Sequence, residues 1–321
     1  MNLSASNWLR APAAAGVFVA ALLLVGCATP QVTRLAESAE AALPQTAQIA
    51  NVPFFPQEEY QCGPAALAMV AQHAGVSVLP DDLTNQVFLP GRQGSLQVEM
   101  LAASRRQGLL AYPLAPQLSD LLREVAAGNP VLVLQNLTFS FSPLWHYAVV
   151  TGYDRSKNTI TLHSGVTETL VMSLFTFERT WARGAYWSMV ALPPSRLPAT
   201  AQADAFAVAS AALERAKPDA AQIAWRTALG KWPDQRAALL GLGNTAYAQG
   251  NLPQAASAFE TATARHPDFA DAWNNLAQVR LEQGRLQDAN VAIERAIALG
   301  GTRAERYRQL QAGIRLKMQP Q

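Results

Sequence analysis

The chain has 321 residues, which is enough for two domains that each bury their own core. Its 25 basic and 23 acidic side chains give a formal net charge of +2, and no basic stripe with interleaved aromatic residues is present. A nucleic-acid partner is therefore not predicted.

Residues 1–27 are typical of a targeting segment. A short basic start precedes an apolar stretch over 13–25, which is too short to remain as a membrane-spanning helix. The tetrad Leu-Val-Gly-Cys at 24–27 resembles a bacterial lipobox. The resemblance implies cleavage before Cys27 and lipid attachment to it, and Ala28 in the next position implies the outer membrane, facing the periplasm. The alternative is an ordinary secretory signal in which Cys27 has no role.

Lipidation of Cys27 would leave Cys62 as the remaining free thiol, so no internal disulfide could form. A lone thiol in an oxidising compartment is prone to oxidation and mispairing, so its presence favours a use. The alternative is a buried, inert cysteine that packs as a small apolar side chain.

Residues 28–50 are rich in Ala, Gln, Thr and Glu and are predicted to be a flexible tether. A first domain follows over 51–193, with helical patterning before β-rich runs. The predicted helices cover 63–74, 95–107 and 117–127, and the predicted strands cover 131–134, 147–150, 159–162 and 186–190. Helices followed by a sheet indicate an α+β fold.

Cys62 is predicted to begin the first of these helices. Gly63, Pro64 and the Ala-, Leu- and Met-rich run to position 74 indicate a helix with proline in its first turn. Free N–H groups and aligned peptide dipoles at a helix start lower a thiol pKa, and a nearby imidazolium lowers it further. His146 opens a distant apolar run and suits the role of base. We therefore predict a reactive thiolate paired with a histidine.

Four motifs together resemble the papain-like cysteine peptidases that process double-glycine leaders of bacteriocins, particularly their stand-alone relatives. They lie at 52–57, 60–67, 89–96 and 146–153. The resemblance implies that Cys62 attacks a carbonyl carbon while His146 takes the thiol proton and later protonates the leaving amine. Gln57 and the backbone N–H of Cys62 would stabilise the oxyanion.

Two positions depart from that family. Gln57 stands five positions before Cys62, whereas the family's glutamine usually stands six before, and a surface glutamine is the alternative. Ser164 occupies the place where the family has an aspartate. A histidine without its carboxylate can still act as a base, but its imidazolium is less stabilised. We expect a weaker or more selective enzyme than a full triad gives.

The other histidines are weaker candidates. His73 suits the negative end of a helix, and His266 lies in a polar turn. His163 is either a substitute orienting group or an ordinary strand residue. Trp145, beside His146, either walls the cleft or packs in the core. The spacing of the histidines and the thiol predicts no metal site, and no cofactor is implied.

After a linker over 194–201, residues recur at a 34-residue spacing. The recurring positions are Ala221, Ala255 and Ala289; Trp225, Phe259 and Ile293; and Ala228, Ala262 and Ala296. They resemble tetratricopeptide repeats, with units at 202–235, 236–269 and 270–303 and a capping helix and tail at 304–321. An all-α solenoid of this kind implies a groove for a protein partner. A generic helical bundle is the alternative.

Together these features predict a papain-like α+β cysteine peptidase domain followed by a tetratricopeptide-repeat solenoid. The leading functional hypothesis is a membrane-anchored periplasmic peptidase that cleaves a peptide or protein and binds a protein through its repeats. The alternative is a weak or inactive peptidase fold that acts as an envelope adaptor, which the serine at position 164 favours. A purely structural scaffold is a third possibility. No membrane-spanning stretch follows Cys27, so a role in export is not inherited from the resemblance.

Overall fold

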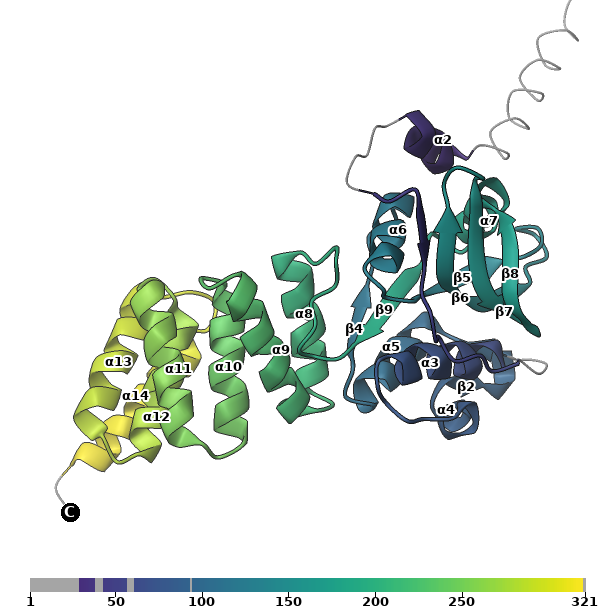
Figure 1. The fold of residues 1–321 in the computed structure, drawn as a ribbon. Coiled ribbons are helices and arrows are strands. Elements are labelled where there is room, and N and C mark those ends of the chain that lie inside the picture. Colours follow the sequence, from purple (N-terminus) through teal and green to yellow (C-terminus); the bar gives the residue numbers. More distant parts are fainter. Residues whose placement is uncertain (1–28, 38–42, 57–60, 93, 320–321) are drawn as a thin grey trace, which may run out of the picture.

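The computed structural model describes residues 29–37, 43–56, 61–92 and 94–319. A mixed α and β domain comes first and an array of helices follows it (Figure 1). Within the described ranges, no helix has the length and apolar character needed to cross a bilayer.

The first domain is built on a seven-stranded antiparallel sheet with the order β4-β9-β5-β6-β7-β8, in which β1 pairs with β6. The strands are β1 (Thr46–Gln48), β4 (Leu110–Pro113), β5 (Val131–Asn136), β6 (Trp145–Asp154), β7 (Thr159–Ser164), β8 (Thr167–Ser173) and β9 (Ser188–Leu192). The central strand β5 is buried along its whole length, which explains its unbroken apolar start.

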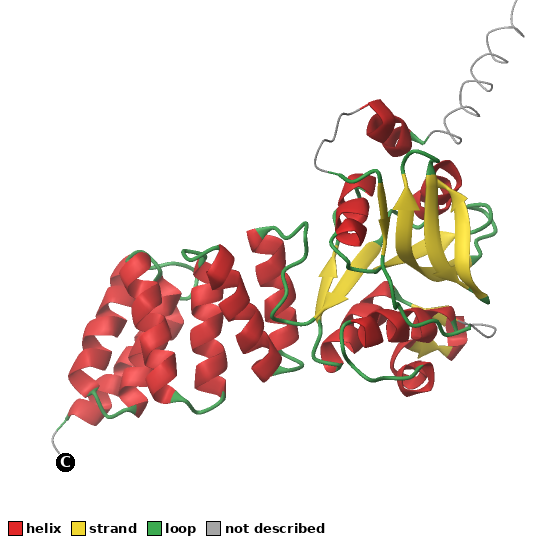
Figure 2. Ribbon diagram, in the orientation of Figure 1, coloured by secondary structure: helices red, strands yellow, loops and turns green. Residues whose placement is uncertain are grey.

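Helices cover both faces of this sheet (Figure 2). The helices are α3 (Cys62–His73), α4 (Pro80–Val87) and α5 (Gln97–Arg106) on one face, and α6 (Leu118–Ala126) and α7 (Leu174–Arg183) on the other. A small hairpin of β2 (Phe88–Leu89) and β3 (Gly94–Ser95), with the 3-10 turn η1 (Pro90–Arg92) between them, packs near α3. Alternate residues of β6 therefore serve two cores: Val149 faces α3, and Val150 faces α6 and α7.

The segment predicted as a flexible tether over 28–50 is instead largely folded onto the domain. Helix α2 (Pro30–Glu37) buries Val32 and Leu35, and β1 pairs with β6. The buried carboxylate of Glu178 on α7 accepts the backbone N–H groups of Gln31 (3.0 Å) and Val32 (2.7 Å). A carboxylate at a helix start is favourable, so this contact docks α2. The sequence did not reveal the docking because its partner lies far away in the chain.

The predicted linker over 194–201 contains no helix or strand, but it is held firmly to the first domain. The buried carboxylate of Glu124 on α6 accepts the backbone N–H groups of Ala199 (3.1 Å) and Thr200 (2.8 Å) and the hydroxyl of Thr200 (2.6 Å). Arg196 also donates to the carbonyl of Ala127 at 2.7 Å. These hydrogen bonds hold the linker against the end of α6.

The helical array consists of α8 (Ala203–Glu214), α9 (Pro218–Lys231), α10 (Arg236–Ala248), α11 (Leu252–Arg265), α12 (Ala270–Glu282), α13 (Leu286–Leu299) and α14 (Ala304–Met318). The small and large residues that recur in the sequence are buried between these helices. A Cβ at Gly241 would overlap Trp225, and one at Gly243 would overlap Phe259, so glycine is needed where the helices approach closely. The predicted α+β domain followed by an all-α repeat solenoid is confirmed.

The first helix pair shares its core with the sheet domain. Phe206 of α8 and Trp225 of α9 belong to the same buried cluster as the residues of β4, α6 and α7. The backbone N–H of Gln202 donates to the hydroxyl of Tyr112 on β4 at 3.1 Å. Apolar contacts and hydrogen bonds therefore both cross the junction, from which the repeats extend to one side of the sheet domain (Figure 1).

Candidate active site

Cys62 is the first residue of α3, as the sequence predicted. Pro64 lies in the first turn, where a helix does not need every backbone N–H. Gly63 is required for a different reason: a Cβ at this position would overlap the side chain of Ser95 on β3. The run from Gly63 to Ala71 is buried against the sheet, which positions the thiol at the edge of the core.

The Cys62 thiol lies beside the strand that carries His146. Its sulfur accepts a hydrogen bond from the backbone N–H of Tyr147, the residue that directly follows His146 on β6. Burial raises the pKa of the Cys62 thiol above its ordinary value, and the N–H groups of Tyr147 and Gly63 offset this only in part. The predicted lowering of this pKa is therefore wrong for the resting site, because desolvation outweighs the helix end. The resting thiol is protonated at neutral pH.

His146 is half-buried at the start of β6 and faces Ser164 at the end of β7. Its Nε2 atom is 2.9 Å from the Oγ atom of Ser164. Burial lowers the pKa of His146 to about 4, so the imidazole is neutral at pH 7. A neutral imidazole beside a neutral hydroxyl can accept a proton, but Ser164 supplies no negative charge to stabilise the imidazolium that results.

Two predicted residues, Gln57 and the lipidation candidate Cys27, lie outside the described residues. The segment leading to Gln57 is held by His163 on β7. The His163 Nε2 atom faces the carbonyl of Val52 at 3.2 Å, and its Nδ1 atom faces the carbonyl of Glu168. With both ring nitrogens engaged elsewhere, His163 does not orient His146. It is a buried structural residue that links β7 to the segment before the active site.

The remaining candidates have local roles. His73, in the last turn of α3, contacts the carbonyl of Gly128 at 3.1 Å, and His266 contacts the carbonyl of Asp234 at 2.6 Å. Trp145 is half exposed beside His146 and does not pack in the core. Among the described residues, no group of three or more His, Cys, Asp or Glu side chains could hold a metal ion.

The backbone N–H of Tyr147 is the site group that sequence reasoning missed. Backbone donors carry no sequence signal of their own, although the alternation of β6 places the Tyr147 side chain on the face of α3. Its hydroxyl donates to the carbonyl of Ser95 at 3.1 Å, which ties β6 to the β2–β3 hairpin. Tyr147 thus connects the thiol, the strand and the hairpin that restricts position 63.

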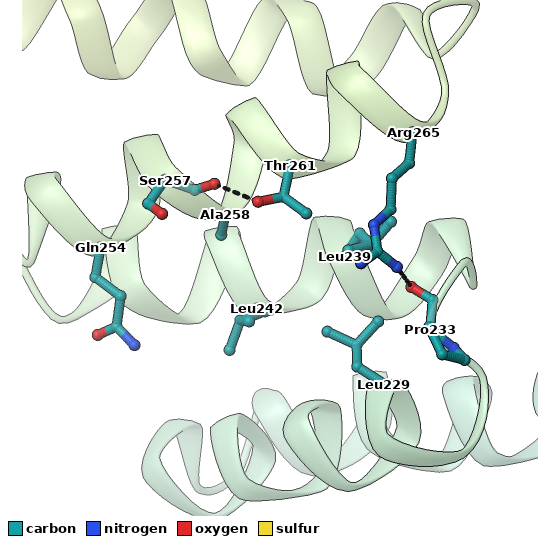
Figure 3. A pocket seen from close by; sticks show the side chains of 9 residues that line it. All are labelled: Leu229, Pro233, Leu239, Leu242, Gln254, Ser257, Ala258, Thr261 and Arg265. Atoms are coloured by element: carbon teal, nitrogen blue, oxygen red, sulfur yellow. Dashed lines mark hydrogen bonds between the residues drawn. The ribbon is translucent and has the colours of Figure 1, made fainter.

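The repeats contain two further hollows. One, of about 310 Å³, lies between α9, α10 and α11 and is largely apolar (Figure 3). In it, Thr261 donates to the carbonyl of Ser257 at 2.9 Å, and Arg265 donates to that of Pro233. Its lining has no thiol or imidazole, so it offers no second catalytic pair.

The second hollow has a volume of about 550 Å³, is lined by both polar and apolar side chains and contains a chain of asparagines. Asn275 donates to Asn244 at 2.9 Å, and Asn274 donates to Asn275 at 3.0 Å. The side-chain oxygen Oδ1 of Asn274 is buried and has no hydrogen-bond partner among the described residues. The hollow therefore has an unused acceptor.

Comparison with known families agrees with this architecture. Residues 49–186 match the Peptidase_C39 like family, and residues 206–258 and 240–304 match a tetratricopeptide repeat family. The chain therefore combines a C39-peptidase-like domain with tetratricopeptide repeats, as its motifs predicted. No curated protein shows significant similarity to the chain.

Several solved structures resemble parts of the chain. A putative C39-like peptidase from Bacillus anthracis is 18% identical over 46% of this chain and 98% of that one, with a TM-score of 0.39. A double glycine motif protease from an AMS/PCAT transporter, solved with the leader peptide, is 20% identical over 45% and 96%, with a TM-score of 0.35. The Sgt2 TPR domain from Aspergillus fumigatus is 24% identical over 37% and 80%, with a TM-score of 0.34.

Proposed function

We propose that this C39-peptidase-like, repeat-bearing chain is a cysteine peptidase that cleaves a peptide or protein through Cys62 and His146. One observation carries the proposal: the Cys62 sulfur bonds to the backbone N–H of the residue after His146. This contact supports the pairing, because it puts the start of α3, which carries the proposed nucleophile, against the strand that carries the proposed base. The family match over residues 49–186 supports peptide hydrolysis as the reaction class.

In this mechanism both groups start neutral, so the proton moves as the bond forms. The Cys62 sulfur attacks the substrate carbonyl carbon while its proton passes to His146. The C–N bond then breaks as His146 protonates the leaving amine, and water hydrolyses the thioester with His146 again as base. The N–H of Tyr147 stabilises negative charge on sulfur, and Gln57 is the proposed side-chain donor to the oxyanion.

Ser164 has a narrower role than a carboxylate would have. Its hydroxyl can accept a hydrogen bond from the Nε2–H of His146 and so hold the ring in position. It supplies no negative charge, and a neutral hydrogen bond is roughly half as strong as a charge-assisted one. We therefore propose slow turnover that depends on binding the correct substrate.

The test is a comparison of new peptide N-termini after incubation of the purified full chain with an envelope protein extract. Wild type should generate a defined set of N-termini that Cys62→Ala and His146→Ala do not generate. His266→Ala is the matched control, because that half-buried histidine lies in the repeats, outside the sheet domain. An identical set of N-termini from wild type and Cys62→Ala would contradict the peptidase.

A second function, an adaptor without turnover, is favoured by one observation: burial raises the pKa of the thiol, and the orienting group is neutral. Substrate trapping separates the two functions. A peptidase should hold its target longer as Cys62→Ala than as wild type, because the complex is not consumed. An adaptor should hold the partner equally in both forms.

The second hollow of the repeats, which contains the asparagine chain, is the proposed site for a protein partner. An extended peptide presents backbone N–H groups, and one of these would satisfy the unpartnered side-chain oxygen Oδ1 of Asn274. Asn274→Leu should therefore weaken capture of the target by the Cys62→Ala trap, whereas Asn251→Ala, a helix-capping change outside the hollow, should not. Equal capture by both variants would exclude the hollow as the partner site.

The proposed location is the bacterial outer membrane, on its periplasmic side, through lipid on Cys27. Helix α2 begins at Pro30, close to Cys27 in sequence, and is docked on α7 by Glu178. Such docking would hold the catalytic domain near the lipid surface. Cys27→Ala should move the chain from the membrane fraction to the soluble fraction, and a chain that stays membrane-bound without added lipid mass would contradict this location.

A further inference from the structure

The connection between β5 and β6 exposes an unusual group of apolar side chains. Within residues 137–145, here called the aromatic hairpin, Phe141 is 87% exposed, Phe139 66% and Trp145 52%. Leu137 and Leu144 are exposed as well. Contiguous exposed apolar residues on a folded domain indicate a surface that is covered by a ligand or partner.

The backbone of the aromatic hairpin is fixed by polar contacts and not by its apolar side chains. The buried Asn136 side chain accepts the N–H groups of Thr138 (3.1 Å) and Leu144 (3.0 Å), while the Asn136 carbonyl accepts two N–H groups of Arg183 (3.1 and 2.9 Å). The N–H of Leu137 donates to the carbonyl of Leu144 at 2.9 Å. The exposed phenylalanines are therefore not needed to build the turn.

The two phenylalanines form one preformed apolar plate. The rings of Phe139 and Phe141 stack with centroids 5.3 Å apart and an interplanar angle of 5°. No residue of the aromatic hairpin carries a charge. Arg183 on α7, which reaches the base of this segment, is engaged with the carbonyl of Asn136. An uncharged, apolar ligand group suits this surface.

The aromatic hairpin is directly followed in the chain by the candidate base. Trp145 and His146 are consecutive residues at the start of β6. Val166, which is 78% exposed, lies two positions after Ser164, the residue that contacts the imidazole, and is a further exposed apolar side chain in this part of the chain. An extended peptide advances about 3.3 Å per residue. Trp145 stands two positions from Tyr147, whose N–H meets the Cys62 sulfur, so a peptide that runs along β6 from Cys62 would pass this end of the aromatic hairpin within about two residues.

We propose that the aromatic hairpin is a specificity subsite that takes a large apolar side chain of the substrate, such as Phe, Leu or Met, within two residues of the cleaved bond. This inference rests on the proposed peptidase function. The substrate is the occupant because the surface is continuous with His146. A bilayer or a second protein covering the aromatic hairpin would also restrict the access of peptide and water to the imidazole.

The experiment measures labelling of Cys62 in the full chain, in detergent micelles, by dipeptidyl acyloxymethyl ketones. Two matched pairs are used, with Phe or Gly at the first or second position from the reactive carbonyl. Burial of a large apolar side chain is worth about 10- to 100-fold in rate. Wild type should label at least about tenfold faster with one Phe ketone than with its Gly partner.

In Phe139→Ser/Phe141→Ser this ratio should fall to about 1 to 3, because the apolar plate is lost. Val208→Ser, at a 71% exposed position on α8 in the repeats, is the matched control and should keep the wild-type ratio. Iodoacetamide, which has no peptide side chain, should react with all three proteins at equal rates. Equal iodoacetamide rates also show that the double variant is folded around Cys62.

The outcomes separate the two proposals. A wild-type ratio near 1 with ready labelling by both ketones, or an unchanged ratio in the double variant, overturns the subsite and leaves the peptidase standing. Failure of every ketone to label Cys62, while iodoacetamide does, overturns the peptidase and the subsite with it. Flotation with phosphatidylethanolamine–phosphatidylglycerol vesicles, carried out in a Cys27→Ala background, tests whether the aromatic hairpin binds a membrane instead of the substrate. Loss of flotation in the double variant with an unchanged ketone ratio would assign the aromatic hairpin to lipid.

Discussion

The Nε2 atom of His146 lies 2.9 Å from the Oγ atom of Ser164, so a neutral hydroxyl holds the candidate base. The geometry resembles that of a catalytic triad, but its electrostatics differ. Because no negative charge faces the ring from Ser164, burial dominates and lowers the pKa of His146 to about 4. This relationship makes position 164 the most informative one to change.

Ser164→Asp should raise the pKa of His146 by about 1 to 3 units, because a carboxylate within hydrogen-bond reach favours the imidazolium. Ser164→Ala should leave this pKa low. The measurement is an NMR titration of the His146 ring proton in all three proteins. Ser164→Thr, which keeps the hydroxyl, is the matched control. A pKa in Ser164→Asp equal to that of wild type would show that position 164 does not act on the ring.

The stability of the first domain should fall between pH 6.5 and pH 4 because of His146. Its folded pKa is about 4 and its ordinary value is 6.5, so the unfolded chain binds the proton first as the pH drops. The stabilisation is present above pH 6.5 and is lost toward pH 4. Between pH 7.5 and pH 5 the free energy of unfolding should fall by about 2 kcal/mol more in wild type than in His146→Gln.

Urea denaturation followed by tryptophan fluorescence at the two pH values measures this difference. His266→Gln serves as the control, since it removes a histidine of the repeats, outside the sheet domain, and should keep the wild-type pH dependence. An equal loss of stability in wild type and His146→Gln would show that the buried ring makes no such contribution.

Gly63→Ala should destabilise the domain by about 1 to 3 kcal/mol, because the new methyl group would overlap Ser95. Ser95→Gly should relieve the overlap, so the double variant should recover most of the loss. Gly91→Ala is the matched control, because a Cβ there meets open space. The readout is the free energy of unfolding, and strictly additive effects of the two changes would refute the contact.

Glu124→Gln should loosen the junction between the two domains. The Glu124 carboxylate accepts hydrogen bonds from Asn129, Ala199 and Thr200, and an amide group would point N–H toward some of these donors. A loss of about 2 to 4 kcal/mol is expected for a buried group of this kind. Hydrogen exchange should rise at residues 199–202, whereas Glu305→Gln, at an exposed position, should change nothing there. Unchanged exchange would mean that the shared apolar core alone fixes the junction.

The places of Cys62 and His146 in the secondary structure could be predicted, but their charge states could not. Cys62 at a helix start and His146 at the start of a strand follow from local patterns, namely a Gly-Pro first turn and an apolar run. The pKa of the thiol depends on how much water the fold removes. Burial raises the pKa of Cys62 more than the N–H groups at the helix start lower it, so the predicted direction of the pKa shift was wrong.

The sequence by itself determined the two domains, the nucleophile helix and the repeat array, because short apolar spacings and a 34-residue period are properties of neighbouring residues. Only the tertiary structure decided that residues 30–37 dock on α7, that the linker is bound by Glu124, and that Ser164 meets His146. Each of these is a contact between segments distant in the chain. Its energy comes from burial and hydrogen-bond geometry, which are set by how the segments pack and not by any local pattern.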